Sequence, residues 1–212
     1  MRLPSNIGET TRTPFSGISG WTHGRFSVGS YSGGYERSEE RLAFFDTFVR
    51  KSGHSEFTIA GPEISSTIEA RCRMRERALD LGDGVSVTTR PMAYRRDFTA
   101  DGRAIPARFE LQEVTGGGTA AYRYERHGEI ALGGEIVRIR SVHKLEGTAL
   151  GTLTPIGYVF EQRGRPVGAV ELNGKPALIL PAGTEPGLAR TLTIAATALA
   201  VFWDPANSQL DD

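Results

Sequence analysis

Residues 191–203, TLTIAATALAVFW, decide the fold that we expect for this chain. The stretch holds no charged residue and would be apolar or hydroxyl-bearing on every side of a helix. A helix that is hydrophobic all round has to be buried. At about 1.5 Å per residue it spans only about 20 Å, and a membrane crossing needs roughly 20 apolar residues. We therefore expect a helix enclosed by the rest of the chain.

The residues before this helix read as short β-strands joined by tight turns. Asp101-Gly102 and Asn173-Gly174 favour the two-residue turns of β-hairpins, and His127 to Glu129 read as a further turn between strands. Such a series predicts a mainly β fold, an antiparallel barrel of roughly ten to twelve strands around the hydrophobic C-terminal helix. The expected strands are residues 56–60, 66–77, 92–99, 105–113, 121–126, 130–132, 135–145, 158–162, 167–172 and 177–180.

An additional helix is predicted before the first of these strands. In residues 37–51, RSEERLAFFDTFVRK, apolar side chains recur at helical spacing from Leu42 to Val49. Glutamates lie in the first turn and basic residues in the last, which suits the helix dipole. We expect this amphipathic helix to cover one side or one end of the sheet.

Residues 1–35 differ from the rest in being rich in glycine and serine, with aromatic residues at intervals. Plain linkers lack such rings, so we predict an N-terminal arm that lies across a surface, followed by a single barrel domain at 36–212. The surface belongs either to the same chain or to a partner protein, because aromatic side chains are favoured interface anchors. The residues predicted to bind a partner are Phe15, Trp21, Phe26, Tyr31 and Tyr35.

The C-terminal half resembles a known architecture, the tubby C-terminal superfold of tubby-like, LURP-one-related and scramblase proteins. The resemblance is carried by residues 157–180, GYVFEQRGRPVGAVELNGKPALIL, and residues 191–204, TLTIAATALAVFWD. It implies an antiparallel barrel of about a dozen strands around a central helix. It also implies binding to lipid headgroups or protein partners more readily than catalysis, and no binding residue of the family maps onto this sequence.

The overall composition restricts the class of function. The 212 residues include 25 basic and 25 acidic side chains, and zero net charge argues against a general nucleic-acid-binding protein. A single cysteine forms no internal disulfide, which suits a reducing compartment. The N-terminal residues lack the apolar stretch of a secretory signal, and no window is long enough for a transmembrane helix. We expect a cytoplasmic protein.

Arginines form the clearest polar pattern. In a strand over residues 69–77, EARCRMRER, alternate side chains share one face. Arg95 and Arg96 lie on another expected strand. Such faces suit a phosphate or carboxylate of an anionic small molecule or lipid headgroup. The alternative is cross-strand ion pairing with Glu110, Glu113 or Glu135. The candidate anion-binding residues are Arg71, Arg73, Arg75, Arg77, Arg138 and Arg140.

No motif predicts a catalytic residue, a metal ligand or a cofactor. Cys72 has no histidine near it in sequence, and the four histidines lack close metal-ligand spacing. The glycine-rich stretches do not have the spacing of phosphate-binding loops. The sequence therefore favours a non-enzymatic binding or assembly module that binds a protein partner through its N-terminal arm. The alternatives are the anion-binding protein and an enzyme whose site is assembled from scattered strands.

Overall fold

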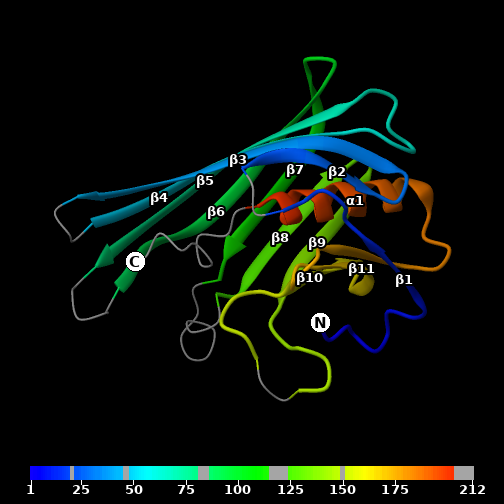
Figure 1. The fold of residues 1–212 in the computed structure, drawn as a ribbon. Coiled ribbons are helices and arrows are strands. Elements are labelled where there is room, and N and C mark those ends of the chain that lie inside the picture. The colour runs from blue at the N-terminus through cyan, green and yellow to red at the C-terminus, as the bar shows by residue number, and fades with distance from the viewer. Residues whose placement is uncertain (20–21, 45–47, 81–85, 115–123, 149–150, 203–212) are drawn as a thin grey trace.

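The protein folds as a mainly β barrel around one helix (Figure 1). The structure is a computed structural model, and it describes residues 1–19, 22–44, 48–80, 86–114, 124–148 and 151–202, with the side chains of 39–44, 48–53, 73–80 and 86–92 left out. Within these residues the elements are β1 (Thr10–Pro14), β2 (His23–Val28), β3 (Tyr31–Phe44), β4 (Phe48–Ile59), β5 (Ile68–Asp80), β6 (Ser86–Ala100), β7 (Arg103–Glu113), β8 (Arg126–Leu132), β9 (Glu135–Val142), β10 (Gly157–Gln162), β11 (Arg165–Glu171), β12 (Ala177–Pro181) and α1 (Pro186–Val201).

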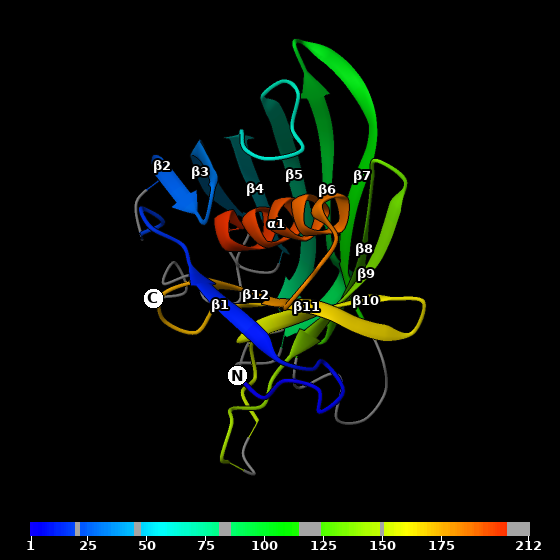
Figure 2. The same ribbon diagram turned by 90° about the vertical axis from the view of Figure 1, so that its right-hand side faces the viewer.

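The strands form one antiparallel sheet in which chain neighbours from β2 to β12 lie side by side, and β1 joins the sheet next to β12. Residues 1–35 thus supply β1, β2 and the start of β3, and with them both edge strands of the sheet. The two edges approach each other at Ser16 and Ser27, whose backbones exchange hydrogen bonds of 2.8 and 3.0 Å. The barrel is therefore nearly closed (Figure 2).

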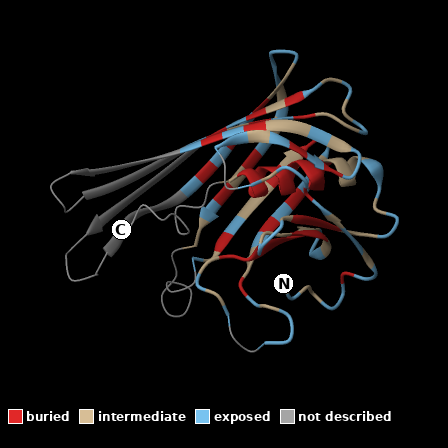
Figure 3. Ribbon diagram, in the orientation of Figure 1, coloured by how far each residue is buried: buried red, intermediate tan, exposed pale blue. Residues whose placement is uncertain are grey.

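Helix α1 lies inside the curved sheet, as the sequence predicts (Figures 2 and 3). Residues 191–201 are all buried, and the helix contacts strands on opposite sides of the barrel, including β4, β9 and β11. Its threonines are satisfied locally, since the Thr193 and Thr197 hydroxyls donate to carbonyls one turn back at 2.7 and 2.8 Å. In the described residues, no helix has both the length and the apolar character to cross a bilayer.

Strand β9 shows how buried apolar residues alternate with exposed ones along a strand. In β9, Val137 and Ile139 are buried, whereas Ile136, Arg138 and Arg140 are exposed. This alternation is typical of an antiparallel sheet with one face in the core and the other in water. The sheet therefore has an inner face that packs on the helix and an outer face that carries most of the described charged side chains.

The hairpin prediction at Asp101-Gly102 is confirmed. Both residues have positive φ angles, 51° and 71°, and they connect β6 to β7, whose pairing begins at Ala100 and Arg103. Positive φ at both central residues is the signature of a type I′ turn, which glycine adopts without the strain that a Cβ would cause.

The helix predicted for residues 37–51 is wrong. The described residues of this stretch belong to β3 and β4, which pair with each other from Tyr35↔Phe57 to Phe44↔Phe48. β4 in turn pairs with β5 along its length. Pairing with both β3 and β5 gives the β4 backbone a complete ladder, and this outweighs the local helical spacing of the apolar residues. The turn predicted at His127 to Glu129 is likewise part of β8.

The first residues of the chain cover a small part of the outer face. Met1 and Leu3 pack on a separate apolar cluster formed by Val159, Ala169 and Ile179, on strands β10 to β12. The α-amino group of Met1 lies 2.5 Å from Oε1 of Glu171. The outer surface of these three strands is thus partly covered, whereas that of β2 to β5 is lined by polar residues.

Candidate functional site

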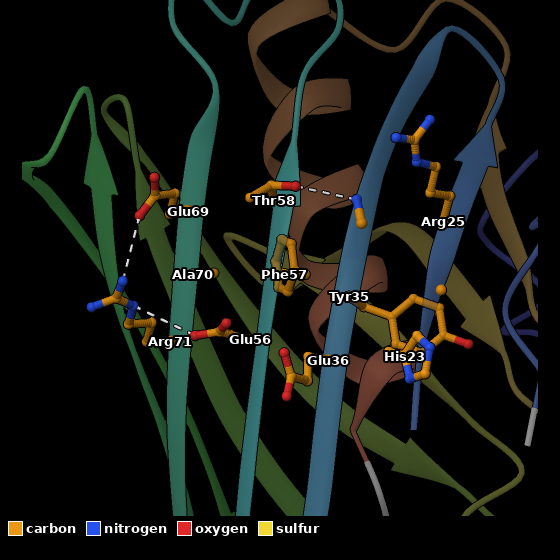
Figure 4. A pocket seen from close by; sticks show the side chains of 12 residues that line it. His23, Arg25, Tyr35, Glu36, Glu56, Phe57, Thr58, Glu69, Ala70 and Arg71 are labelled. Carbon is orange, nitrogen blue, oxygen red and sulfur yellow. Dashed lines mark hydrogen bonds and ion pairs between the residues drawn. The ribbon is translucent and has the colours of Figure 1, made fainter. Parts of the chain in front are cut away.

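A groove with a volume of about 570 Å³ lies on the outer face over the four neighbouring strands β2 to β5 (Figure 4). Its floor includes Gly24, Gly34 and Ala70. The charged and titratable side chains that line it are His23, Arg25, Glu36, Glu56, Glu69 and Arg71. Because each strand contributes to the lining, the groove exists only when the register of all four strands is formed.

Two consecutive glycines shape this part of the sheet in different ways. A Cβ added to Gly33 would lie 1.8 Å from the carbonyl oxygen of Thr58, so the β3 backbone approaches β4 more closely there than a side chain allows. A Cβ added to Gly34 would meet nothing nearer than 3.6 Å. The Gly34 N–H donates to Oγ1 of Thr58 at 3.1 Å (Figure 4). Gly33 therefore permits the close approach, and Gly34 leaves the groove open.

A row of charged side chains crosses the groove in strand register. His23 pairs with Glu36, Glu36 with Glu56, and Glu56 with Arg71. Nε of Arg71 lies 3.6 Å from Oε2 of Glu56, and its Nη2 lies 3.9 Å from Oε2 of Glu69 (Figure 4). Glu36 has no ion pair with any residue that the structure describes. The carboxylates of Glu36 and Glu56 thus lie opposite each other on β3 and β4. The Arg71 guanidinium on β5 is shared between Glu56 and Glu69.

The arginines predicted from the sequence lie in different places. Arg71 lies on β5 and lines the groove. Arg138 and Arg140 lie on β9, and the three strands β6, β7 and β8 stand between β9 and β5. Nη2 of Arg140 is 2.7 Å from Oε1 of Glu161, and Arg138 is exposed and pairs in register with Glu129 and Glu161. The side chains of Arg73, Arg75 and Arg77 fall outside the described part of the chain.

Most of the aromatic residues predicted for the N-terminal arm lie against the chain's own core. Phe15 and Phe26 are buried, with ring centroids 6.3 Å apart. Tyr35 is also buried and lines the groove from below, and Tyr31 packs on the core while partly exposed. Trp21 is outside the described residues. The buried rings position β2 and β3 under the groove.

The inner face holds the buried arginines Arg96 and Arg126, which the sequence did not distinguish from the exposed arginines. Arg96 is 1% exposed, and its Nη2 donates to Oγ of Ser55 at 3.0 Å, to the carbonyl of Ala198 at 3.2 Å and to the hydroxyl of Tyr94. Ala198 carries one of the last carbonyls of α1, which have no partner within the helix. A cation at this end also suits the helix dipole. The sequence held a signal for the burial of Arg96, because in a strand this residue shares one face with Tyr94 and Phe98.

A second buried guanidinium belongs to Arg126 at the start of β8. Its Nη1 donates to the hydroxyl of Tyr158 at 3.3 Å, and its Cζ lies 5.6 Å from the ring centroid of Phe202, the residue that ends α1. Two arginines from different strands therefore approach the C-terminal end of the helix. These contacts indicate that the two arginines help to hold the helix within the barrel.

Cys72 lies on the inner face beside this cluster and is fully buried. Burial raises its pKa to about 11, although the nearby Arg96 guanidinium lowers it. Burial likewise raises the pKa of Tyr94. A thiol that stays protonated at neutral pH is a poor nucleophile. In the described ranges, no three His, Cys, Asp or Glu side chains are arranged to hold a metal ion.

Comparisons of this chain with protein families, curated proteins and solved structures found no match. The resemblance to the tubby superfold therefore stays a prediction from the order of elements.

Proposed function

We propose that this protein is a non-enzymatic binding module that binds a protein partner through the face that its N-terminal residues help to form. The groove over β2 to β5 carries the proposal. Five of its lining residues, His23, Gly24, Arg25, Gly34 and Tyr35, belong to residues 1–35. Four strands spaced by about 4.8 Å span about 14 Å, the length of roughly four residues of extended chain. The groove thus suits a short extended segment of a partner.

The surroundings of the carboxylates support binding rather than catalysis. Glu36 is exposed, and the side chain of Glu56 is 42% exposed. Acid–base catalysts usually lie where burial or a neighbouring charge tunes their pKa. Solvated carboxylates that line an open surface are better suited to recognising a complementary charge.

The second candidate function, binding of an anionic small molecule or lipid headgroup by arginine-lined faces, has less support. Arg95, Arg108 and Arg140 each lie within 3.1 Å of a glutamate oxygen. Arg71 lies between Glu56 and Glu69. An anion would have to displace these carboxylates. A lipid vesicle that contains anionic headgroups is therefore included as a probe in the test below.

The sharpest test fills the groove without removing a strand. Deleting residues 1–35 would remove both edge strands, whereas Gly34→Trp adds a side chain in the groove at an ordinary φ, with a Cβ that meets its neighbours at 3.6 and 3.8 Å, ordinary van der Waals distances. Gly187→Trp is the control, because an added Cβ there meets nothing within 4 Å and the residue lies on α1, outside the groove. Both variants should keep the wild-type circular dichroism spectrum.

The measurement is a selection of random linear peptides on the wild-type protein, followed by affinity measurements on the two variants. We expect peptides that lose at least about tenfold in affinity for Gly34→Trp and keep their affinity for Gly187→Trp. Equal binding to both variants, or no selected peptide, would count against the proposal. Groove-dependent binding of anionic vesicles with no peptide selected would favour the second candidate instead.

A further inference from the structure

We infer that the segment bound in the groove carries one basic side chain, a lysine or an arginine, that lies between Glu36 and Glu56. The inference rests on the proposed function and adds the chemistry of the partner. The two glutamates occupy directly opposed positions on β3 and β4, and like charges in such positions destabilise a sheet. A cation supplied by a ligand relieves this repulsion.

Among the side chains that the structure describes, no cation is held closely by this pair. Glu36 has no ion pair with any described residue. Arg71 is shared, at 3.6 Å from Glu56 and 3.9 Å from Glu69, so neither carboxylate holds it at hydrogen-bond distance. Elsewhere on the outer face, Arg95, Arg108 and Arg140 each meet a glutamate at 2.7 to 3.1 Å. Glu36 thus offers a ligand in the groove a carboxylate with which no described cation pairs.

The flanking charges limit the partner to a single basic residue. Arg25 lies on β2 and Arg71 on β5, the outer two of the four strands, and Glu36 and Glu56 lie on the inner two (Figure 4). A run of basic residues across the groove would meet both arginines, and like charges repel. The best ligand therefore has a central lysine or arginine with neutral or acidic residues on either side.

An organic cation fits better than a metal ion. In the part of the chain that the structure describes, these carboxylates are not joined by a third ligand in a metal-binding arrangement. A lysine or arginine needs no such geometry, because a single charge-assisted hydrogen bond to a carboxylate orients it. Extended chain also places successive side chains on opposite sides, so a central basic residue can point into the groove while its neighbours point away.

The test compares a peptide with a central lysine and neutral flanks with the same peptide carrying glutamine at that position. Fluorescence anisotropy is measured against the wild type, the double variant Glu36→Gln/Glu56→Gln, and the control Glu129→Gln/Glu161→Gln. The control removes the same charge from the outer face outside the groove. We expect the wild type and the control to prefer lysine by about tenfold or more. The groove double variant should lose this preference, and added salt should weaken it.

Failure of the inference and failure of the proposed function give different results. If selected peptides need an open groove, as judged with Gly34→Trp, but show no preference for a central basic residue, the inference is wrong and the proposed function stands. If a three-lysine peptide binds the wild type more tightly than the single-lysine peptide, the limit to one basic residue is wrong. If no peptide depends on the groove, the proposed function itself fails.

Discussion

Arg95 and Arg96 are consecutive residues of β6 that lie on opposite faces of the sheet. Arg95 points into water, with a side chain that is 64% exposed and Nη2 at 2.8 Å from Oε1 of Glu110. Arg96 is 1% exposed and donates to neutral acceptors, among them the carbonyl of Ala198 in the last turn of α1. The same residue type thus holds the helix on the inner face and forms an exposed ion pair on the outer face. The difference indicates that the buried arginine contributes more to stability than the exposed ion pair does.

The largest expected effect comes from removing the inner arginine. Arg96→Ala removes the guanidinium that donates to Ser55 and Ala198, leaves the Tyr94 hydroxyl as their remaining partner and opens a cavity, so we expect the free energy of unfolding to fall by about 3 kcal/mol or more. Urea denaturation followed by circular dichroism measures it. Arg96→Met keeps most of the apolar stem and should recover part of the loss. A wild-type midpoint for Arg96→Ala would show that the helix is held by apolar contacts alone.

Two neighbouring glycines provide the next test, in the strand that carries the groove. Gly33→Ala would place a Cβ against the backbone of Thr58, where only a shift of β3 or β4 relieves the clash, so we expect a loss of about 2 kcal/mol. Gly34→Ala adds a Cβ that meets its nearest neighbours at ordinary van der Waals distances, 3.6 and 3.8 Å, and should change stability by less than about 0.5 kcal/mol. Thermal unfolding of the two variants under identical conditions measures the difference. Equal melting temperatures would mean that the close approach of β3 to β4 is not fixed.

Cys72 provides an intermediate test that depends on pH. Its thiol has a folded-state pKa of about 11 against an ordinary value of 9.0, chiefly through burial. The unfolded chain therefore releases this proton first, and stability falls as pH rises from about 9 through about 11. Cys72→Ala should make this decline less steep, and the buried Tyr94, whose pKa is also raised, should account for part of what remains.

The same residue supplies a chemical readout of the inner face. In the folded protein at pH 8, a thiol reagent should modify Cys72 only as fast as the chain unfolds, because the side chain is fully buried. Addition of urea to the midpoint should restore rapid reaction. Fast modification without denaturant would contradict the closed inner face on which the comparison depends.

The barrel and its helix were predictable because their signals are local. The uncharged stretch at residues 191–203 requires burial wherever it lies, and Asp101-Gly102 specifies a turn from its own backbone preferences. Residues 37–51 were predicted wrongly because they belong to the paired strands β3 and β4, and β4 pairs in turn with β5, a partner that the local spacing of the apolar residues does not record. The groove was missed for a similar reason, since Glu36 and Glu56 become neighbours only through the register of β3 and β4.

The smallest expected effect lies with the outer arginine. An exposed ion pair on a sheet gains little in water, so Arg95→Ala and Glu110→Ala should each change the free energy of unfolding by less than about 1 kcal/mol. Their coupling in a double-mutant cycle should be below about 0.5 kcal/mol and should shrink further in 0.5 M salt. A large, salt-resistant coupling would mean that the outer face also contributes to stability. Charge changes in the groove would then alter folding and binding together, whereas a weak coupling allows Glu36 and Glu56 to be varied for their effect on binding alone.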